Sequence, residues 1–469
     1  MTAYTKVLPL VCGVALGVLA ADRTFTSYAS LKPVFDQPGD LLPAELRNPN
    51  EAKWRAWTQQ QDKAIRARLQ QGDLDSMVNL LLYGTSFTKQ PRIKVEAFTE
   101  ASKSGILRAR MDDLVAGLRN PGDNERLTFL NGLLRSHGVD TSSPGETGVF
   151  IYNNLGRVLQ EITTLAKRGA EAKSLITPDV VPPDVVRTDT APDPAAIFNW
   201  RPGLFRDRGV SLDTGIFPNF SIEQALRDLK NRGVLREGQV ARVAVIGPGL
   251  DFGDKNEQAS FDYYPQQTLQ PFALYDSLLR LGLAKANAVS MTVFDISPRV
   301  IAHIQRARER ARNTGYVIQL PREVTPPWPA DLIAYWRSLG DRVGAEIAPI
   351  APPGVFQGHN GGPSIDTRAV QIRPDVVLSI HPVDLNIVLE RTNLAEADRF
   401  DLMVGTNIFI YYDAFERSLA LENAGAMLKR GGLLLTNDQL PEVPGGSMRL
   451  AGVTGVQYNH DSIGWYRKR

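Results

Sequence analysis

Arg242–Asp254 reads RVAVIGPGLDFGD, and Val289–Ser297 reads VSMTVFDIS. The first stretch is an apolar, β-branched run that ends in a glycine turn, and the second is an apolar run that ends on a carboxylate, Asp295. Such runs are typical of buried parallel strands, and a glycine turn lets a ligand approach the backbone closely. An acidic side chain at the end of the next strand can accept hydrogen bonds from ribose hydroxyls. The two stretches therefore predict an α/β domain that binds a nucleoside-containing cofactor.

Strand and helix patterns alternate from Ala241 onwards, which predicts a central, mostly parallel sheet with right-handed crossovers. The predicted strands are Val243–Ile246, Met291–Phe294, Tyr316–Gln319, Leu402–Thr406 and Gly432–Thr436. The predicted helices are Leu269–Leu281, Arg299–Arg312, Asp331–Leu339 and Asp413–Leu428. Ile347–Pro374 is rich in Pro and Gly, and we interpret it as either a lid or substrate loop or an irregular insertion.

Residues from about 40 to 175 have helical patterns. Ala52–Gln71 places Trp54, Trp57, Ile65 and Leu69 on one helical face. Further helices are predicted from the N-cap Asp73 to Gly84, over Val95–Leu118, Glu125–Ser136 and Glu146–Lys173, and from a capping-box pattern at Ser221 to Gly233. We therefore expect a helical region over residues 21–176, a Pro-rich linker over 177–200 and a Rossmann-like domain over 201–469.

The first 20 residues have the layout of a secretory signal peptide. Lys6 precedes the apolar run Val7–Ala21, and Val18-Leu19-Ala20 resembles a small-residue cleavage site. The run is short for a membrane span, which needs about 20 apolar residues, although an uncleaved N-terminal anchor is the alternative. We expect an exported or periplasmic protein, or else a membrane-anchored protein with a cytoplasmic domain. Cys12 is the only cysteine, so a cleaved chain has no disulfide and no thiolate site.

Charge and histidine content exclude some function classes. The chain has 53 basic and 51 acidic residues and a net charge of +2, which gives no reason to expect nucleic acid as a partner. The five histidines are scattered and none has metal-ligand spacing, so we predict no metal site and expect each histidine on the surface or in a loop.

The C-terminal half, from about Val240 to the end, resembles class I S-adenosylmethionine-dependent methyltransferases. The resemblance rests on four places: the turn Gly247-Pro248-Gly249, the strand-end acid Asp295, the segment FDLMVGTNIFIYYD (Phe400–Asp413) and the unit MLKRGGLLLTN (Met427–Asn437). It implies an α/β fold in which a Rossmann-like methyltransferase domain follows an α-helical N-terminal region. It also implies S-adenosylmethionine as the cofactor and methyl transfer to an unidentified acceptor.

The resemblance implies a set of cofactor-binding positions. Gly247 and Gly249 would admit the amino-acid moiety, Asp295 with the neighbouring Ile296 would hold the ribose, and Asp251 or Asp254 could pair with the ammonium group. Asn407, Tyr411 and Tyr412 are the candidate catalytic residues. Asn407 would face the sulfonium end, and the two tyrosines would form the wall of the transfer site, because aromatic faces favour a cation.

The sequence also departs from the family pattern. Val245 replaces the acid expected two residues before the first glycine, and Asp251 replaces the third glycine. The cofactor of the family is kept in the cytoplasm, which conflicts with an export signal. An exported, non-catalytic binding module on a degenerate methyltransferase fold is therefore the alternative function. A nicotinamide-dependent oxidoreductase is a third reading, which the long offset from the turn to Asp295 disfavours.

Overall fold

The computed structural model describes residues 23–36, 42–93, 104–175, 209–252, 263–323, 328–350, 366–456 and 462–469. The expected export segment with Cys12, the linker at 177–200 and Asp254 lie outside these residues. In the part of the chain that is described, no helix combines the length and the apolar character that a membrane span requires.

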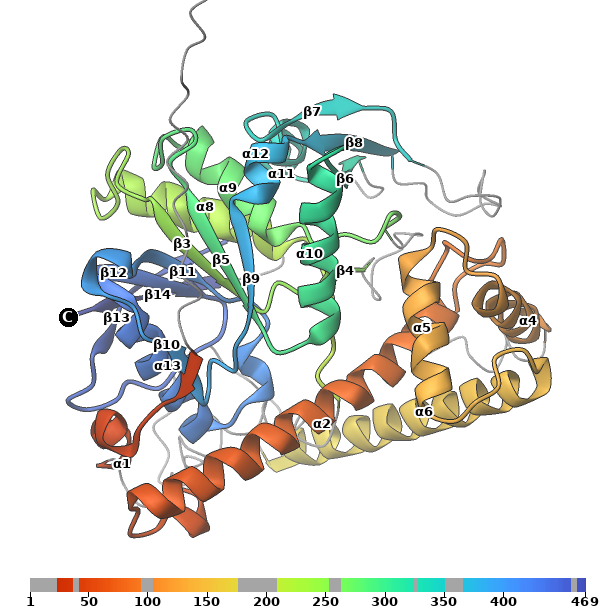
Figure 1. Cartoon of the computed structure of the whole chain (residues 1–469), viewed down its shortest axis with the longest axis horizontal. Coiled ribbons are helices and arrows are strands. Elements are labelled where there is room, and N and C mark those ends of the chain that lie inside the picture. Colours follow the sequence, from red (N-terminus) through yellow and green to blue (C-terminus); the bar gives the residue numbers. More distant parts are fainter. Residues whose placement is uncertain are drawn as a thin grey trace, which may run out of the picture.

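A seven-stranded sheet forms the centre of the C-terminal part (Figure 1). Its strands, in spatial order, are β13 (Met448–Gly455), β14 (Ser462–Lys468), β12 (Leu428–Thr436), β11 (Phe400–Val404), β3 (Arg242–Ile246), β5 (Ser290–Asp295) and β9 (Ile380–Asp384). The five strands from β12 to β9 are parallel, and β14 is antiparallel to both of its neighbours. The chain winds outwards from β3 through β5 to β9 and then returns to β11 on the other side of β3. This reversal creates a topological switch point between β3 and β11, where doubly wound folds bind their ligands.

The third strand of the sheet is β9, which sequence reasoning missed. The run IHPVD contains the polar His381 and also Pro382, which lacks a backbone donor. Because β9 pairs only with β5 and lies at the edge of the sheet, it tolerates a proline. The predicted strand Tyr316–Gln319 does exist as β6 (Tyr316–Glu323), but it belongs to a separate antiparallel sheet with β7 (Gly344–Ile347) and β8 (Asp366–Ile372).

Helices pack around the sheet. Those close to predicted positions are α8 (Pro218–Asn231), α9 (Gln270–Arg280), α10 (Pro298–Ala311), α11 (Ala330–Ser338) and α13 (Ala414–Met427). The short helix α12 (Pro374–Leu378) was not predicted. Asp413 and Glu416 form a capping box at the start of α13. The capping box expected at Ser221 is wrong, because α8 already begins at Pro218, whose fixed φ suits the first helical position.

Among the described residues, the N-terminal part consists mainly of the helices α2 (Glu51–Tyr83), α4 (Ile106–Arg119), α5 (Glu125–Ser136) and α6 (Pro144–Leu175). The predicted break at Asp73 is wrong, since α2 is one continuous helix of 33 residues that includes Asp73. Gly72 does not end the helix but allows close packing, because a Cβ atom there would lie 1.9 Å from the carbonyl oxygen of Val210. Before α2, β1 (Arg23–Phe25) pairs with β10 (Glu390–Thr392), and α1 (Lys32–Phe35) follows.

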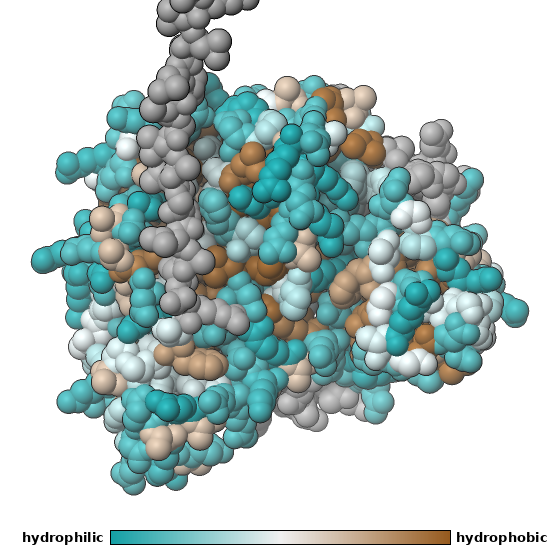
Figure 2. Space-filling view, viewed as in Figure 1, coloured by the Kyte–Doolittle hydropathy of each residue, from teal (hydrophilic) through white to brown (hydrophobic). Residues whose placement is uncertain are grey.

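Helix α2 contributes to two hydrophobic cores. Trp54, Ile65 and Leu69 in its first part pack into the core of the sheet domain. Met77 to Tyr83 in its last part pack with α4, α5 and α6 in a second core, which Phe252 from the sheet domain also enters. The helix therefore ties the helical region to the carboxyl edge of the sheet (Figure 1). Figure 2 shows that hydrophilic side chains cover most of the visible face and that hydrophobic ones gather in small separate patches.

Candidate functional site

Residues at the carboxyl ends of β3, β5 and β11 form the candidate site. Because parallel strands end at the same edge, the structure brings together the turn after β3, Asp295 at the end of β5 and Asn407 beyond β11. This edge is the switch point of the sheet. The elements that sequence reasoning assigned to the cofactor therefore do meet in space.

Backbone conformation and packing require glycine at Gly247 and Gly249. Gly247 and Gly249 have φ values of 59° and 65°, in the left-handed region that glycine populates readily. A Cβ atom on Gly247 would lie 2.7 Å from Cδ1 of Ile408, and one on Gly249 would lie 2.7 Å from the carbonyl oxygen of Leu212. Both glycines thus allow other segments of the chain to approach the turn, whether or not a ligand also does.

Asp295 is a buried carboxyl group held by backbone donors. Its side chain is 6% exposed, and its Oδ1 accepts a hydrogen bond of 2.8 Å from the backbone N–H of Ser297. Burial raises its pKa to about 7, the nearby Asp384 adds to the rise, and backbone donors that include Gly249 oppose it. Register pairs Asp295 with Asp384 at the end of β9, so two acids stand side by side at this edge.

Asp251, by contrast, is enclosed by the chain. It lies on β4 (Leu250–Asp251), which pairs with β2 (Asp213–Thr214), and it is 1% exposed. Its Oδ2 accepts a hydrogen bond of 2.9 Å from Nε2 of Gln267. Burial raises its pKa to about 7, against hydrogen bonds from Gln267 and Leu269. The structure therefore places the Asp251 carboxyl against its own chain.

The edge between β3 and β11 holds a polar group without a partner. Nε2 of Gln270 donates a hydrogen bond of 2.7 Å to Oγ1 of Thr406. Its Oε1 is buried and accepts no hydrogen bond from the described residues. Asn407 follows Thr406 in the chain and has a left-handed φ of 58°. Its backbone N–H donates to the side chain of Asn437, and its own side-chain oxygen accepts from the amide of Asn437. A buried acceptor of this kind calls for a donor from a ligand or a water. Sequence reasoning missed Gln270 as a site residue, although it opens the helix after the glycine turn.

The two candidate tyrosines differ in exposure. Tyr412 is 1% exposed, and burial raises its pKa well above its ordinary value. Tyr411 is only partly buried, and its carbonyl oxygen accepts a hydrogen bond of 3.1 Å from Arg68. Tyr412 is thus mainly a packing residue, and Tyr411 is the more accessible of the two.

Helix α2 crosses this edge and supplies residues that sequence reasoning did not assign to the site. Arg66 donates a hydrogen bond of 3.3 Å to the carbonyl oxygen of Ile296 and forms an ion pair of 2.9 Å with Asp384. Asp62 lies in the same network, 3.0 Å from Arg66. Asp384 could have been predicted from the pattern that indicated Asp295, an acidic residue at the end of a strand. Nothing in the sequence indicates that α2 contacts these strands.

The histidine expectation is wrong for His303. This residue is 1% exposed on α10 and is bonded by Nδ1 to Glu125 at 2.9 Å and by Nε2 to the hydroxyl of Tyr316 at 2.7 Å. Among the residues that the structure describes, no group of three or more His, Cys, Asp or Glu side chains could hold a metal ion.

The sequence matches no protein-family model and no curated protein. Similar solved structures include a TehB-like SAM-dependent methyltransferase from Corynebacterium glutamicum, with 10% identity, 54% of this chain and 98% of that chain covered, and a TM-score of 0.25. Magnesium protoporphyrin IX methyltransferase from Synechocystis PCC 6803 has 11% identity, coverage of 60% and 100%, and a TM-score of 0.27. A glycopeptide N-methyltransferase has 11% identity, coverage of 53% and 93%, and a TM-score of 0.26.

The C-terminal part has the strand order and strand directions of a class I S-adenosylmethionine-dependent methyltransferase fold. We take this from the order and direction of the strands in this chain, and we take no activity from similarities of that size. Two groups at this edge could hold a ligand that carries hydrogen-bond donors. Asp295 offers a carboxyl group and Gln270 an unpaired acceptor.

Proposed function

We propose that this chain binds S-adenosylmethionine at the carboxyl edge of β3, β5 and β11 and transfers its methyl group to an acceptor. The observation that carries the proposal is the unpaired Oε1 of Gln270 beside Asn407, at the same switch point as the buried acid Asp295. A ligand donor is one way to satisfy a buried acceptor, and other buried acceptors without a hydrogen bond from the described residues, such as Oδ1 of Asn219 and Oδ2 of Asp276, are not among the residues at the switch point. Here the unpaired acceptor coincides with the position at which the fold binds ligands.

Two groups of the chain would hold the cofactor. The carboxylate of Asp295 would accept hydrogen bonds from the ribose hydroxyls. Oε1 of Gln270 would accept a hydrogen bond from the ammonium group.

When bound, the cofactor supplies an electrophilic methyl group on a sulfonium centre. The contribution of the protein to such a displacement is mainly positioning. Asn407 and Tyr411 orient the transfer site, and Arg66 and Arg68 of α2 hold the residues that follow β5 and β11. Because α2 also carries the helical region, that region is placed where it can influence the choice of acceptor.

Calorimetric titration of the full chain with S-adenosylhomocysteine tests this proposal. We expect saturable binding of one molecule per chain and no binding of NAD at the same concentrations. A Gln270→Leu variant should bind more weakly by about tenfold, because it removes the acceptor for the ammonium group. Absence of S-adenosylhomocysteine binding by the folded wild-type protein, or binding of NAD instead, would contradict the proposal.

A further inference from the structure

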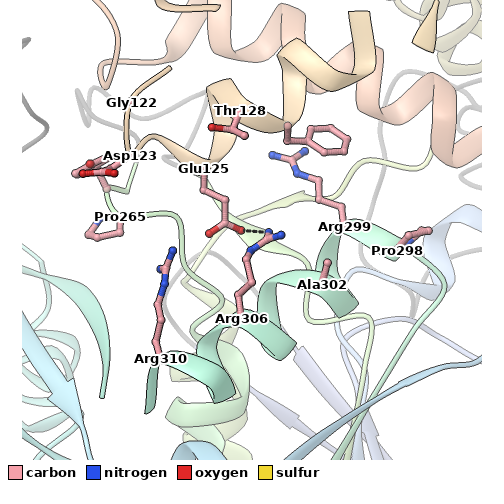
Figure 3. A pocket seen from close by; sticks show the side chains of 12 residues that line it. Gly122, Asp123, Glu125, Thr128, Pro265, Pro298, Arg299, Ala302, Arg306 and Arg310 are labelled. Carbon is pink, nitrogen blue, oxygen red and sulfur yellow. Dashed lines mark hydrogen bonds and ion pairs between the residues drawn. The ribbon is translucent and has the colours of Figure 1, made fainter. Parts of the chain in front are cut away.

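A second concave site lies between the helical region and the sheet domain, and none of the residues assigned to the cofactor lines it. A pocket of about 720 Å³ opens between the start of α5 and the outer face of α10 (Figure 3). Its apolar walls include Phe129, Pro265 and Pro298. Three arginines of α10, Arg299, Arg306 and Arg310, also line it. Its volume is in the range of pockets that bind small molecules.

The guanidinium group of Arg299 is buried and only partly bonded. Its side chain is 2% exposed, and its Nη2 donates a hydrogen bond of 3.0 Å to Oε1 of Gln266. Its Nε and Nη1 are buried and donate no hydrogen bond to the described residues, and the nearest carboxylate oxygen, from Asp73, is 3.7 Å from Nη1. Burial, and then the charge of the nearby Arg126, lower its pKa to about 10. Two buried donors thus lack acceptors at the wall of a pocket.

Glu125 does not supply the missing acceptor. Burial opposes its ionisation, but the hydrogen bonds and charges of His303 and Arg306 outweigh burial and lower its pKa to about 2. Its Oε1 already accepts hydrogen bonds from His303, Arg306 and Gln266. This carboxylate is therefore neutralised by its neighbours, and Figure 3 shows it turned toward Arg306.

Arg310 adds a cation at the mouth of the pocket. It lies on the same face of α10 as Ala302 and Arg306, two turns beyond Ala302, and Figure 3 shows it extending toward Pro265. Within the described residues its guanidinium group forms no hydrogen bond and no ion pair, and the residue is exposed. The pocket therefore combines apolar walls, two unsatisfied guanidinium donors and the cation of Arg310, and one further carboxyl group, that of Asp123, lies on its lining.

We propose that this pocket binds a small organic anion, whose carboxylate or phosphate accepts hydrogen bonds from Arg299 and Arg310. Guanidinium groups recognise both kinds of anion through paired N–H donors. The apolar body of the ligand would lie against Phe129, Pro265 and Pro298. The proposal is independent of the cofactor site, because it rests on α5 and α10 and on none of the residues assigned to the cofactor.

Titration of the full chain with phenyl phosphate, benzoate and benzyl alcohol, at constant ionic strength, tests the proposal and distinguishes the two anions. We expect one saturable site for at least one of the two anions and none for benzyl alcohol, which has the same ring but no charge. Equal affinity for benzyl alcohol, or no saturable binding of either anion, would overturn the proposal.

Variants on α10 provide the matched comparison. Arg310→Gln should weaken anion binding by about tenfold, because it removes a charged donor. Arg312→Gln removes the same charge two residues away, outside the pocket, and should leave binding unchanged. Ala302→Leu, which fills the pocket without changing charge, should also weaken binding. If both arginine variants weakened binding equally, the anion would be responding to the overall positive charge of α10, which would contradict a specific site.

Discussion

Asp251 lies on β4, shortly after β3, and Asp295 ends β5, the strand beside β3. Both acids are buried and both have a pKa raised to about 7, yet their surroundings differ. Asp251 lies on β4, which pairs with β2, and its carboxyl group accepts a hydrogen bond from Gln267, so the chain encloses it. Asp295 ends β5 at the switch point, beside the turn at Gly249 and opposite Asp384. A raised pKa alone therefore does not identify a site, and the position of the group in the topology distinguishes the two acids.

The largest effect is expected at Gly249, which lies between the two acids. Gly249→Ala should lower the free energy of unfolding by about 2–4 kcal/mol, through a left-handed φ and contact with the carbonyl oxygen of Leu212. Gly445→Ala is the matched control, since Gly445 also has a positive φ but no atom lies within 4 Å of its Cβ position. It should lose only about 1–2 kcal/mol. Equal losses in urea unfolding would show that residues 212–214 do not close the turn.

The second expected effect is a pH dependence of stability that both acids share. Each folded-state pKa is about 7, above the ordinary value of 3.8, so the protonated carboxyl stabilises the fold. This contribution is complete below about pH 4 and is lost as the pH rises to about 7. Between pH 5.5 and 8, each group should lower the free energy of unfolding by about 2 kcal/mol.

Asp251→Asn and Asp295→Asn should each reduce that slope when unfolding is measured at both pH values. The remaining slope comes from other buried acids with raised pKa values, among them Asp73, Asp276 and Glu416. A slope that neither variant changes would mean that both carboxyl groups stay ionised in the folded protein. An effect of only one variant would show that the two environments differ in burial as well as in topology.

The third expected effect is a pH dependence of cofactor affinity, which should involve Asp295 and not Asp251. In the proposed function, ribose hydroxyls would donate to the ionised form of Asp295, so cofactor affinity should be full above pH 7 and should fall as the carboxyl takes up its proton. We expect the Kd of S-adenosylhomocysteine to rise by about tenfold from pH 8 to pH 6. Asp251→Asn should keep this dependence, and Asp295→Asn should lose it. Calorimetry at three pH values would show this, and a Kd independent of pH in the wild-type protein would contradict the role of Asp295.

The sequence predicted the sheet domain well where local pattern and final environment agree. The runs at β3, β5, β11 and β12 are apolar because both faces of these strands are covered, and Asp413 was placed at the start of its helix because it caps α13. The strand β9 was missed because an edge strand can carry Pro382 and His381. The position of a strand in a sheet is a tertiary property that a linear pattern does not contain.

Long-range contacts account for most of what was missed at the site. Arg66 and Arg68 belong to a helix whose charged residues suggest a solvent-exposed face. Their contacts with Ile296, Asp384 and Tyr411 form only because α2 crosses the edge of the sheet. The break predicted at Asp73 does not occur, because the preceding Gly72 allows the close approach of Val210, a residue more than a hundred positions away in the chain. The domain boundary at 177–200 stays a prediction, and the shared core at Trp54 and Ile65 means that a cleaved chain should remain associated.

The most direct test of the account is the affinity of S-adenosylhomocysteine for the wild-type chain, Asp295→Asn and Asp251→Asn at pH 8. We expect Asp295→Asn to bind more weakly by about 1.5–3 kcal/mol, because it loses hydrogen bonds to a charged acceptor, while remaining at least as stable as the wild type. Asp251→Asn should change the affinity by less than about threefold. Equal affinity of all three folded proteins, or a larger loss for Asp251→Asn, would contradict the assignment of the cofactor site to the end of β5.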